Sequence, residues 1–250
     1  MITDSFDPSG ETLFTPEAFF GEQKHFGRLA VVTYSDEILE NALQQFPHEI
    51  IGHFGSVNGM RPIYLLDIGD RKVICYLSSI GSAMAGTQLI EINWLTGAEQ
   101  FIVFGSAGSL HKETTENRYV IPTEAFRDEG LSYHYAPAAD YIAVRQSNRM
   151  AECFEKLGLP YVQGRIWTTD AFYRETRSRV AQRKAEGCIA VEMEIAGMQA
   201  VSDFHGFELY PFLVTGDILD QPQYSYEGLS EANHAMGKFH TALALARLLS

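Results

Sequence analysis

Short apolar runs alternate with helical segments through most of this chain, and this alternation limits the folds that it can adopt. The runs that we expect to form strands lie at 29–33, 62–68, 72–78, 100–104, 118–126, 161–168, 188–191 and 209–215. Segments between them carry helical periodicity, and Ala and Leu dominate the terminal segment 229–249. Strands that alternate with helices are typical of a sheet covered on both faces. The pattern therefore predicts an α/β fold with a central mixed β-sheet between helices, as one domain.

The first 27 residues differ from the rest because Pro8, Gly10, Pro16 and Gly21 interrupt them. We expect residues 1–27 to form an irregular N-terminal arm and residues 28–250 to form the single domain. Glycine and asparagine at 52–61 predict a loop, and 222–228 is a second predicted loop.

A net charge of −13 argues against nucleic acid as a partner, because phosphate backbones are bound by Lys and Arg. No apolar run approaches the ~18 residues that a membrane span needs, so no membrane partner is expected. Cys75, Cys153 and Cys188 are widely spaced, which predicts buried free thiols rather than disulfides. The histidines show no metal-ligand spacing, and the N-terminus shows no signal pattern. We therefore expect a cytoplasmic protein without a metal.

Two acidic segments follow apolar runs near the end of the chain. The run 188–191 leads directly into Glu192, Met193 and Glu194, and the run 209–215 is followed by Asp217. Ligands of open α/β sheets bind beyond the carboxyl ends of the strands, so both segments are candidate site residues. Because side chains alternate in an extended chain, one glutamate should face the site while the other caps the following helix. We favour Glu194 for the ligand; the alternative is that both are ordinary N-terminal helix carboxylates.

Three further segments carry residues suited to a small ligand. Two turns can offer N–H groups and hydroxyls to an anion, or they can be simple turns without a ligand. One is the Gly/Ser loop with Gly105 and Ser106, and the other is the strand-to-helix turn with Gly81 and Ser82. Phe172 can stack on a flat heterocycle, although phenylalanine is more often part of a core.

Taken together, these segments resemble the nucleoside phosphorylase superfamily, which includes uridine phosphorylase, hexameric purine nucleoside phosphorylase and the methylthioadenosine nucleosidases. Similar motifs occur in the same order from about residue 29 to the end of the chain. They are Phe104–Leu110, Arg127–His134, Thr168–Tyr173, Val191–Glu194 and Thr215–Asp217. The segment Arg127–His134 is similar to uridine phosphorylases in particular. The resemblance implies a nucleoside phosphorylase-like three-layer sandwich.

The resemblance also implies a reaction and a role for each candidate. Phosphate would cleave the bond between ribose and base, with no cofactor, in a homo-oligomer that is a dimer or a trimer of dimers. Glu194 would accept hydrogen bonds from the ribose hydroxyls, and Asp217 would protonate or hydrogen-bond the leaving base. The remaining substrate-binding candidates are Gly81, Ser82, Gly105, Ser106, Arg127, Phe172, Tyr173, Glu192 and Met193.

Two departures from the family pattern keep other functions open. Phosphorolytic relatives usually carry an arginine where this chain has Val103, and a Gly-Asp-Pro-x-Arg turn where it has Tyr34–Leu39. Arg61 is a candidate for a missing phosphate arginine. We favour a uridine phosphorylase-like enzyme; the alternatives are a hydrolytic nucleosidase and a non-catalytic nucleoside-binding protein. Asp217 favours a purine base, whereas the segment with Arg127 favours uridine. Candidates for contacts to a pyrimidine are Glu175, Arg177 and Arg179.

Overall fold

The computed structural model of the protein describes residues 1–221 and 232–249. In this part of the chain ten strands form one mixed sheet in the order β10-β6-β8-β9-β5-β1-β4-β3-β2, with β7 paired to β6. The strands are β1 (Leu29–Thr33), β2 (His48–Ser56), β3 (Gly59–Asp67), β4 (Lys72–Leu77), β5 (Gln100–Ser109), β6 (Tyr119–Asp128), β7 (Tyr141–Ala143), β8 (Tyr161–Thr169), β9 (Cys188–Glu192) and β10 (Glu208–Ile218). The predicted loop 222–228 lies outside the described residues.

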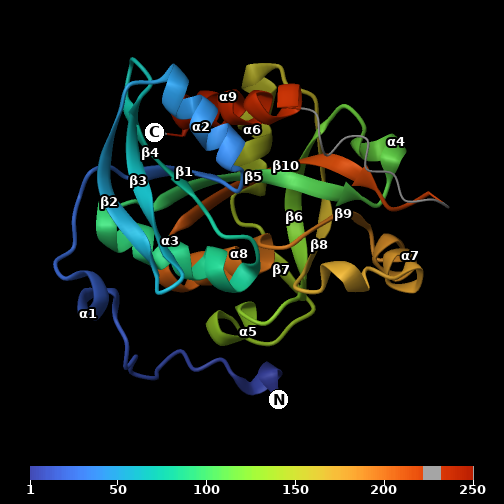
Figure 1. Ribbon diagram of the computed structural model, residues 1–250. Helices are drawn as coiled ribbons and strands as arrows, with labels where there is room; N and C mark the ends of the chain where they lie inside the picture. Colours follow the sequence, from blue (N-terminus) through green and yellow to red (C-terminus); the bar gives the residue numbers. More distant parts are fainter. Residues whose placement is uncertain (222–231, 250) are drawn as a thin grey trace.

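Helices cover both faces of this sheet, as the alternation predicts. In Figure 1, α2, α6 and α9 lie on one side of the sheet, and α3, α5 and α8 lie on the other. The helices are η1 (Ile2–Asp4), α1 (Pro16–Phe20), α2 (Asp36–Gln45), α3 (Ser82–Thr96), α4 (Lys112–Thr115), α5 (Ser132–Tyr135), α6 (Ser147–Leu157), η2 (Phe172–Arg174), α7 (Arg177–Ala185), α8 (Ile195–His205) and α9 (Ala232–Leu248). The three-layer α/β fold is confirmed.

The sheet closes on itself at one end. Strand β10 pairs with β5 on one side and with β6 on the other, while β9 pairs with both β8 and β5. These five strands therefore form a closed ring, which brings the carboxyl ends of β5, β9 and β10 close together. The acidic segments that the sequence places after β9 and in β10 meet at this end of the molecule.

The prediction of a loop over 52–61 is wrong. Strands β2 and β3 pair in antiparallel register across this segment, from His48 opposite Leu66 to Ser56 opposite Gly59. Glycine is required here by close packing: a Cβ on Gly55 would lie 2.4 Å from the carbonyl oxygen of Gly59. The glycines thus mark a hairpin with a bulge near Gly52 rather than a break in the sheet.

Strand β10 is longer than the sequence predicts. It continues to Ile218, so Asp217 lies within the strand and not just beyond its end. The pairing with β5 shifts register between Thr215 and Asp217, where the strand bulges. A bulge changes the direction in which a side chain points. It accounts for a buried aspartate near the end of a strand whose middle is apolar.

All three cysteines are buried and free, as expected. None of the helices in the described ranges is apolar and long enough to cross a membrane. Residues 1–28 contain only the short helices η1 and α1, and the boundary at residue 27 stays a prediction.

Helix α8 packs so closely on α3 that Gly197 has no room for a side chain. A Cβ at this position would lie 2.7 Å from Ser82 Cβ and 3.0 Å from Ser82 Oγ. We expect Gly197→Ala to lower the free energy of unfolding by about 1–3 kcal/mol, because overpacking displaces the backbone. Chemical denaturation measures this change.

Gly237 on α9 is the matched control, because among the described residues no atom outside the adjacent helix backbone lies within 4 Å of its Cβ position. Gly237→Ala should leave stability unchanged or raise it by up to ~1 kcal/mol through helix propensity. Equal denaturation midpoints for Gly197→Ala and the wild type would contradict the close packing of α3 on α8.

Candidate active site

A cavity of about 310 Å³ lies at the carboxyl ends of the central strands. Its walls come from the ends of β1, β5, β9 and β10, together with residues of η2 and α9. The lining residues are Thr33, Tyr34, Ser35, Ile38, Ile80, Val103, Phe104, Gly105, Ser106, Ala107, Gly108, Phe172, Glu175, Val191, Glu192, Met193, Glu194, Ile195, Leu213, Asp217 and Lys238. Its size and location suit a small-molecule ligand.

Glu192 and Glu194 both line the cavity, but they have different surroundings. Glu192 is buried, and its carboxylate accepts hydrogen bonds from the backbone N–H groups of Glu194 (2.7 Å) and Ile195 (2.8 Å) and from the Thr168 hydroxyl. It therefore caps the start of α8. Glu194 accepts a hydrogen bond from the Gly81 N–H at 2.7 Å and is also influenced by the Met193 backbone, and its carboxylate retains acceptor capacity for a ligand.

Burial raises the pKa of both glutamates. For Glu192 the negative charge of Glu194 adds to this effect, whereas for Glu194 the hydrogen bond from Gly81 opposes it. Two neighbouring carboxyls in a poorly solvated cavity are stabilised by donors, such as the hydroxyls of a sugar.

Gly81 and Ser82 lie behind the cavity wall instead of lining it. The hydroxyl of Ser82 donates to the carbonyl oxygens of Met193 (3.0 Å) and Glu194 (3.3 Å). The N-terminus of α3 thus fixes the position of the 193–194 backbone. In this structure Gly81 and Ser82 hold residues that line the cavity, and a contact of their own with a ligand stays a prediction.

Asp217 and Glu175 bring two acids to another wall of the same cavity. Asp217 is buried, and its Oδ1 lies 3.4 Å from the Cβ position of Gly108, an ordinary packing distance. Burial, together with the charge of Asp217, raises the pKa of Glu175 to about 7. This wall can therefore hold a proton near neutral pH.

Phe172 forms the aromatic part of the lining, and its side chain is 48% exposed. A core phenylalanine would be covered, so this exposure favours a ring that stacks on a ligand. Tyr173 packs edge-on against Phe172 with ring centroids 5.0 Å apart, but it is 94% exposed and does not line the cavity.

Arg127 does not reach the cavity. Its guanidinium donates to Ser132 Oγ (2.7 Å) and to the carbonyl oxygen of Pro137 (2.6 Å), and it stacks over the Tyr133 ring at 4.3 Å. These contacts hold the loop that follows β6. Its donors are thus used inside that loop, and a contact between Arg127 and a substrate stays a prediction.

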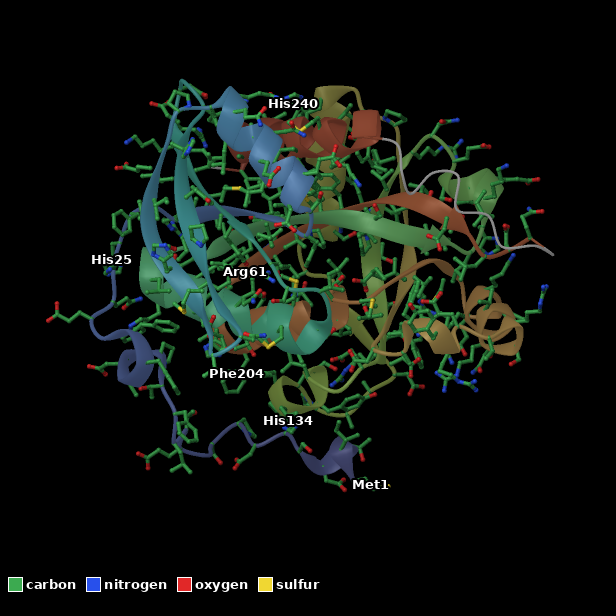
Figure 2. The ribbon with its side chains drawn as sticks, viewed as in Figure 1. Met1, His25, Arg61, His134, Phe204 and His240 are labelled. Carbon is green, nitrogen blue, oxygen red and sulfur yellow. The ribbon has the colours of Figure 1, made fainter. Side chains whose placement is uncertain are left out.

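Arg61, the candidate for a missing phosphate arginine, also lies outside the cavity. It extends from β3 (Figure 2), and its guanidinium donates to the carbonyl oxygen of Leu77 at 3.3 Å.

Tyr34 packs beside the Gly/Ser loop of the cavity. Its ring approaches the Cβ position of Gly105 to 3.7 Å, and its hydroxyl donates to the sulfur of Met198 at 3.2 Å. An aromatic ring thus occupies the wall beside the Gly/Ser loop.

Lys238 lines the cavity, and the sequence analysis did not predict this. It lies on α9 and is 9% exposed, and its ammonium donates to the Ser106 hydroxyl at 3.0 Å. Within residues 1–221 and 232–249 no other Lys or Arg lines the cavity, and no carboxylate forms a salt bridge with Lys238 there. Burial lowers the pKa of its ammonium. A lysine inside a helix rich in Ala and Leu gave no local signal of this placement.

The described residues contain no cluster of His, Cys, Asp and Glu that would hold a metal ion. The structure defines a class of protein: an α/β protein whose small-molecule cavity combines acids, an exposed aromatic ring and one buried cation.

The family model of the phosphorylase superfamily matches residues 28–248, and the chain belongs to this superfamily. Members of the superfamily need no cofactor. The chain is 29% identical over 129 residues to a DeoD-type purine nucleoside phosphorylase from Exiguobacterium, an alignment that covers 49% of this chain and 53% of the relative. The chain thus spans about half the length of that relative.

A DeoD-type purine nucleoside phosphorylase from Myxococcus xanthus is 28% identical over 190 residues, with 73% of this chain and 74% of the relative aligned. Among solved structures, the 5'-methylthioadenosine/S-adenosyl homocysteine nucleosidase of Campylobacter jejuni matches with a TM-score of 0.71 at 17% identity. That match covers 88% of this chain and 98% of the nucleosidase. At this identity the likeness concerns the fold alone.

Proposed function

We propose that this protein cleaves the N-glycosidic bond of a purine ribonucleoside with phosphate, releasing the free base and ribose-1-phosphate. The observation that carries the proposal is that Glu194, Phe172 and Asp217 line one cavity. A nucleoside has three parts that match them: vicinal hydroxyls for a carboxylate, a flat base for an aromatic ring and a basic ring nitrogen for an acid.

The proposed reaction assigns a step to each of these residues. The C1′–N9 bond breaks and its electron pair moves into the purine, while Asp217 donates a proton to N7 so that the base leaves neutral. Glu194 accepts hydrogen bonds from the 2′ and 3′ hydroxyls and stabilises the cationic sugar. A phosphate oxygen then forms the new bond to C1′.

Lys238 and Ser106 support phosphate as the nucleophile. Among the described residues, the hydrogen-bond partner of this buried ammonium is a neutral hydroxyl, so donors remain for an anion, and residues 105–108 line the same cavity. Water would not need this charge. The pair thus supplies a cation that this chain lacks at the positions where phosphorolytic relatives carry arginine.

The geometry supports a purine rather than uridine. The resemblance to uridine phosphorylases depended on the segment 127–134, and the guanidinium of Arg127 is bound within its own loop. Arg179, a candidate contact for a pyrimidine, donates to Asp128 at 2.7 Å. Both relatives described above are named as purine nucleoside phosphorylases. Assembly into a homo-oligomer and residence in the cytoplasm stay predictions.

Incubation with adenosine, inosine and uridine, with and without inorganic phosphate, tests the proposal. We expect ribose-1-phosphate from a purine nucleoside only when phosphate is present. Free ribose at equal rates without phosphate would instead establish the hydrolytic nucleosidase, and saturable binding without either product would establish a binding protein.

We expect Lys238→Met to raise the KM for phosphate about tenfold or more, because a hydrogen bond to a charged group contributes about 1.5–3 kcal/mol. Lys238→Arg should recover most of this loss, and the KM for the nucleoside should change little. Steady-state kinetics with varied phosphate measures both constants, with Lys24→Met at an exposed position as the control. An unchanged KM for phosphate in Lys238→Met would remove the lysine from this role.

A further inference from the structure

Helix α8 begins at Ile195, and Glu194 occupies the position directly before it, where a side chain often caps a helix. A capping side chain accepts a hydrogen bond from the backbone N–H of the second or third helical residue. Within the described helix α8 the carboxylate of Glu194 makes no such bond. It accepts from the N–H of Gly81, before α3, at 2.7 Å. The cap of α8 therefore comes from other residues.

Two side chains from neighbouring strands supply this cap. Glu192 at the end of β9 accepts hydrogen bonds from the N–H groups of Glu194 (2.7 Å) and Ile195 (2.8 Å). The hydroxyl oxygen of Thr168, near the end of β8, accepts from the N–H of Ala196 at 3.1 Å. Ala196 is the second helical residue, so Thr168 binds the N–H that a side chain at position 194 would otherwise reach.

The pairing of β8 with β9 places Thr168 for this contact. Thr168 lies opposite Glu192 in the parallel register of the two strands, and its hydroxyl donates to the Glu192 carboxylate. Both residues are buried. Removal of the hydroxyl would take a donor from Glu192 and an acceptor from the N–H of Ala196, and a buried polar group without a partner is unfavourable.

We propose that Thr168 is a positioning residue: it caps α8 in place of Glu194 and so leaves the Glu194 carboxylate on the cavity wall, available to the sugar. Thr168 itself is not part of that wall. The inference rests on the proposed contact between Glu194 and the ribose hydroxyls. Without the Thr168 hydroxyl, Glu194 turns to the N–H of Ala196 and gives up its bond from Gly81.

A crystal structure of Thr168→Val tests this rotation directly, because valine has nearly the shape of threonine but no hydroxyl. We expect the Glu194 carboxylate within hydrogen-bonding distance of the Ala196 N–H. Thr168→Ala also lacks the hydroxyl and should give the same result, whereas Thr168→Ser should keep the wild-type arrangement. A Glu194 carboxylate that stays on the Gly81 N–H in Thr168→Val or Thr168→Ala would overturn the inference.

The kinetic readout is the preference for adenosine over 2′-deoxyadenosine, measured as the ratio of their kcat/KM values. A displaced Glu194 loses its contact to the 2′ hydroxyl, which only adenosine carries. We therefore expect Thr168→Val to lower the ratio about tenfold, as for one lost hydrogen bond to a charged group. Thr168→Ser should keep the ratio of the wild type.

Thr96→Val is the matched control. The buried hydroxyl of Thr96 also accepts a backbone N–H (Ala98, 3.2 Å) and donates to an oxygen (the Ile92 carbonyl, 2.6 Å), but Thr96 ends α3 and does not line the cavity. Thr96→Val should lower stability and leave the ratio unchanged. Equal losses on both nucleosides in Thr168→Val, as from a structural defect alone, would overturn the inference.

Failure of the proposed function gives a different result. If the wild type cleaves neither nucleoside, or if Glu194 rotates in Thr168→Val while the ratio stays the same, the proposed role of Glu194 at the ribose is contradicted. In both cases a rotated Glu194 in the crystal structure would still support positioning by Thr168, and an unmoved Glu194 would exclude it.

Discussion

Glu194→Gln should lower kcat for a purine nucleoside by about 100-fold or more, as expected when an interaction specific to the transition state is lost. The carboxylate stabilises positive charge that develops on the ribose, and a neutral amide stabilises it far less. The amide oxygen of glutamine can still accept the hydrogen bond from Gly81, which is 2.7 Å long in the wild type. The fold around residues 193–194 should therefore persist.

Stopped and continuous assays of base release give kcat, and thermal denaturation verifies that the variant is folded. Glu40→Gln makes the same chemical change on an exposed surface and should retain wild-type kinetics. A folded Glu194→Gln variant with a kcat within about threefold of the wild-type value would show that stabilisation of the ribose in the transition state does not depend on this carboxylate.

Asp217→Asn should lower kcat for adenosine by about 10²–10⁴-fold, the range that a general acid contributes. Asparagine keeps the shape of the side chain, so Gly108 and the bulge in β10 should accommodate it. What it removes is the proton that the departing base takes up at N7. The loss should appear in kcat rather than in the KM for phosphate.

A nucleoside methylated at N7 separates acid catalysis from a general loss of structure. Its base already carries the positive charge that protonation would provide, so it leaves without help from an acid. We expect Asp217→Asn to cleave 7-methylguanosine at a rate close to that of the wild type. Equal losses on adenosine and on the methylated nucleoside would contradict proton donation by Asp217.

The sequence predicts much of this fold because local periodicity determines it. Apolar runs such as 29–33 and 209–215 become buried strands, and Ser35 caps α2 by accepting from the Ile38 N–H at 3.3 Å. The hairpin of β2 and β3 was missed because glycines that permit close backbone packing also occur in loops. Strand β10 was predicted too short, since a bulge has no clear signature in a single strand.

Glu192, Glu194 and Asp217 were accessible to sequence reasoning because they lie at or just beyond the carboxyl ends of largely apolar strands. Lys238 was not accessible: it contacts Ser106 across 132 positions of the chain, and only the packing of α9 on the sheet brings them together. For Arg127 the limit of the sequence is of another kind. Its motif was visible, but the hydrogen bonds that turn its guanidinium towards Ser132 and Pro137 depend on the conformation of the following loop.

A crystal structure of the protein with an unreactive adenosine analogue and phosphate is the most direct measurement of how this cavity is used. The account predicts Glu194 within hydrogen-bonding distance of the 2′ and 3′ hydroxyls, the base against Phe172 with N7 facing Asp217, and phosphate on Lys238 and Ser106. An analogue bound with its ribose away from Glu194, or with its base away from Asp217, would contradict it.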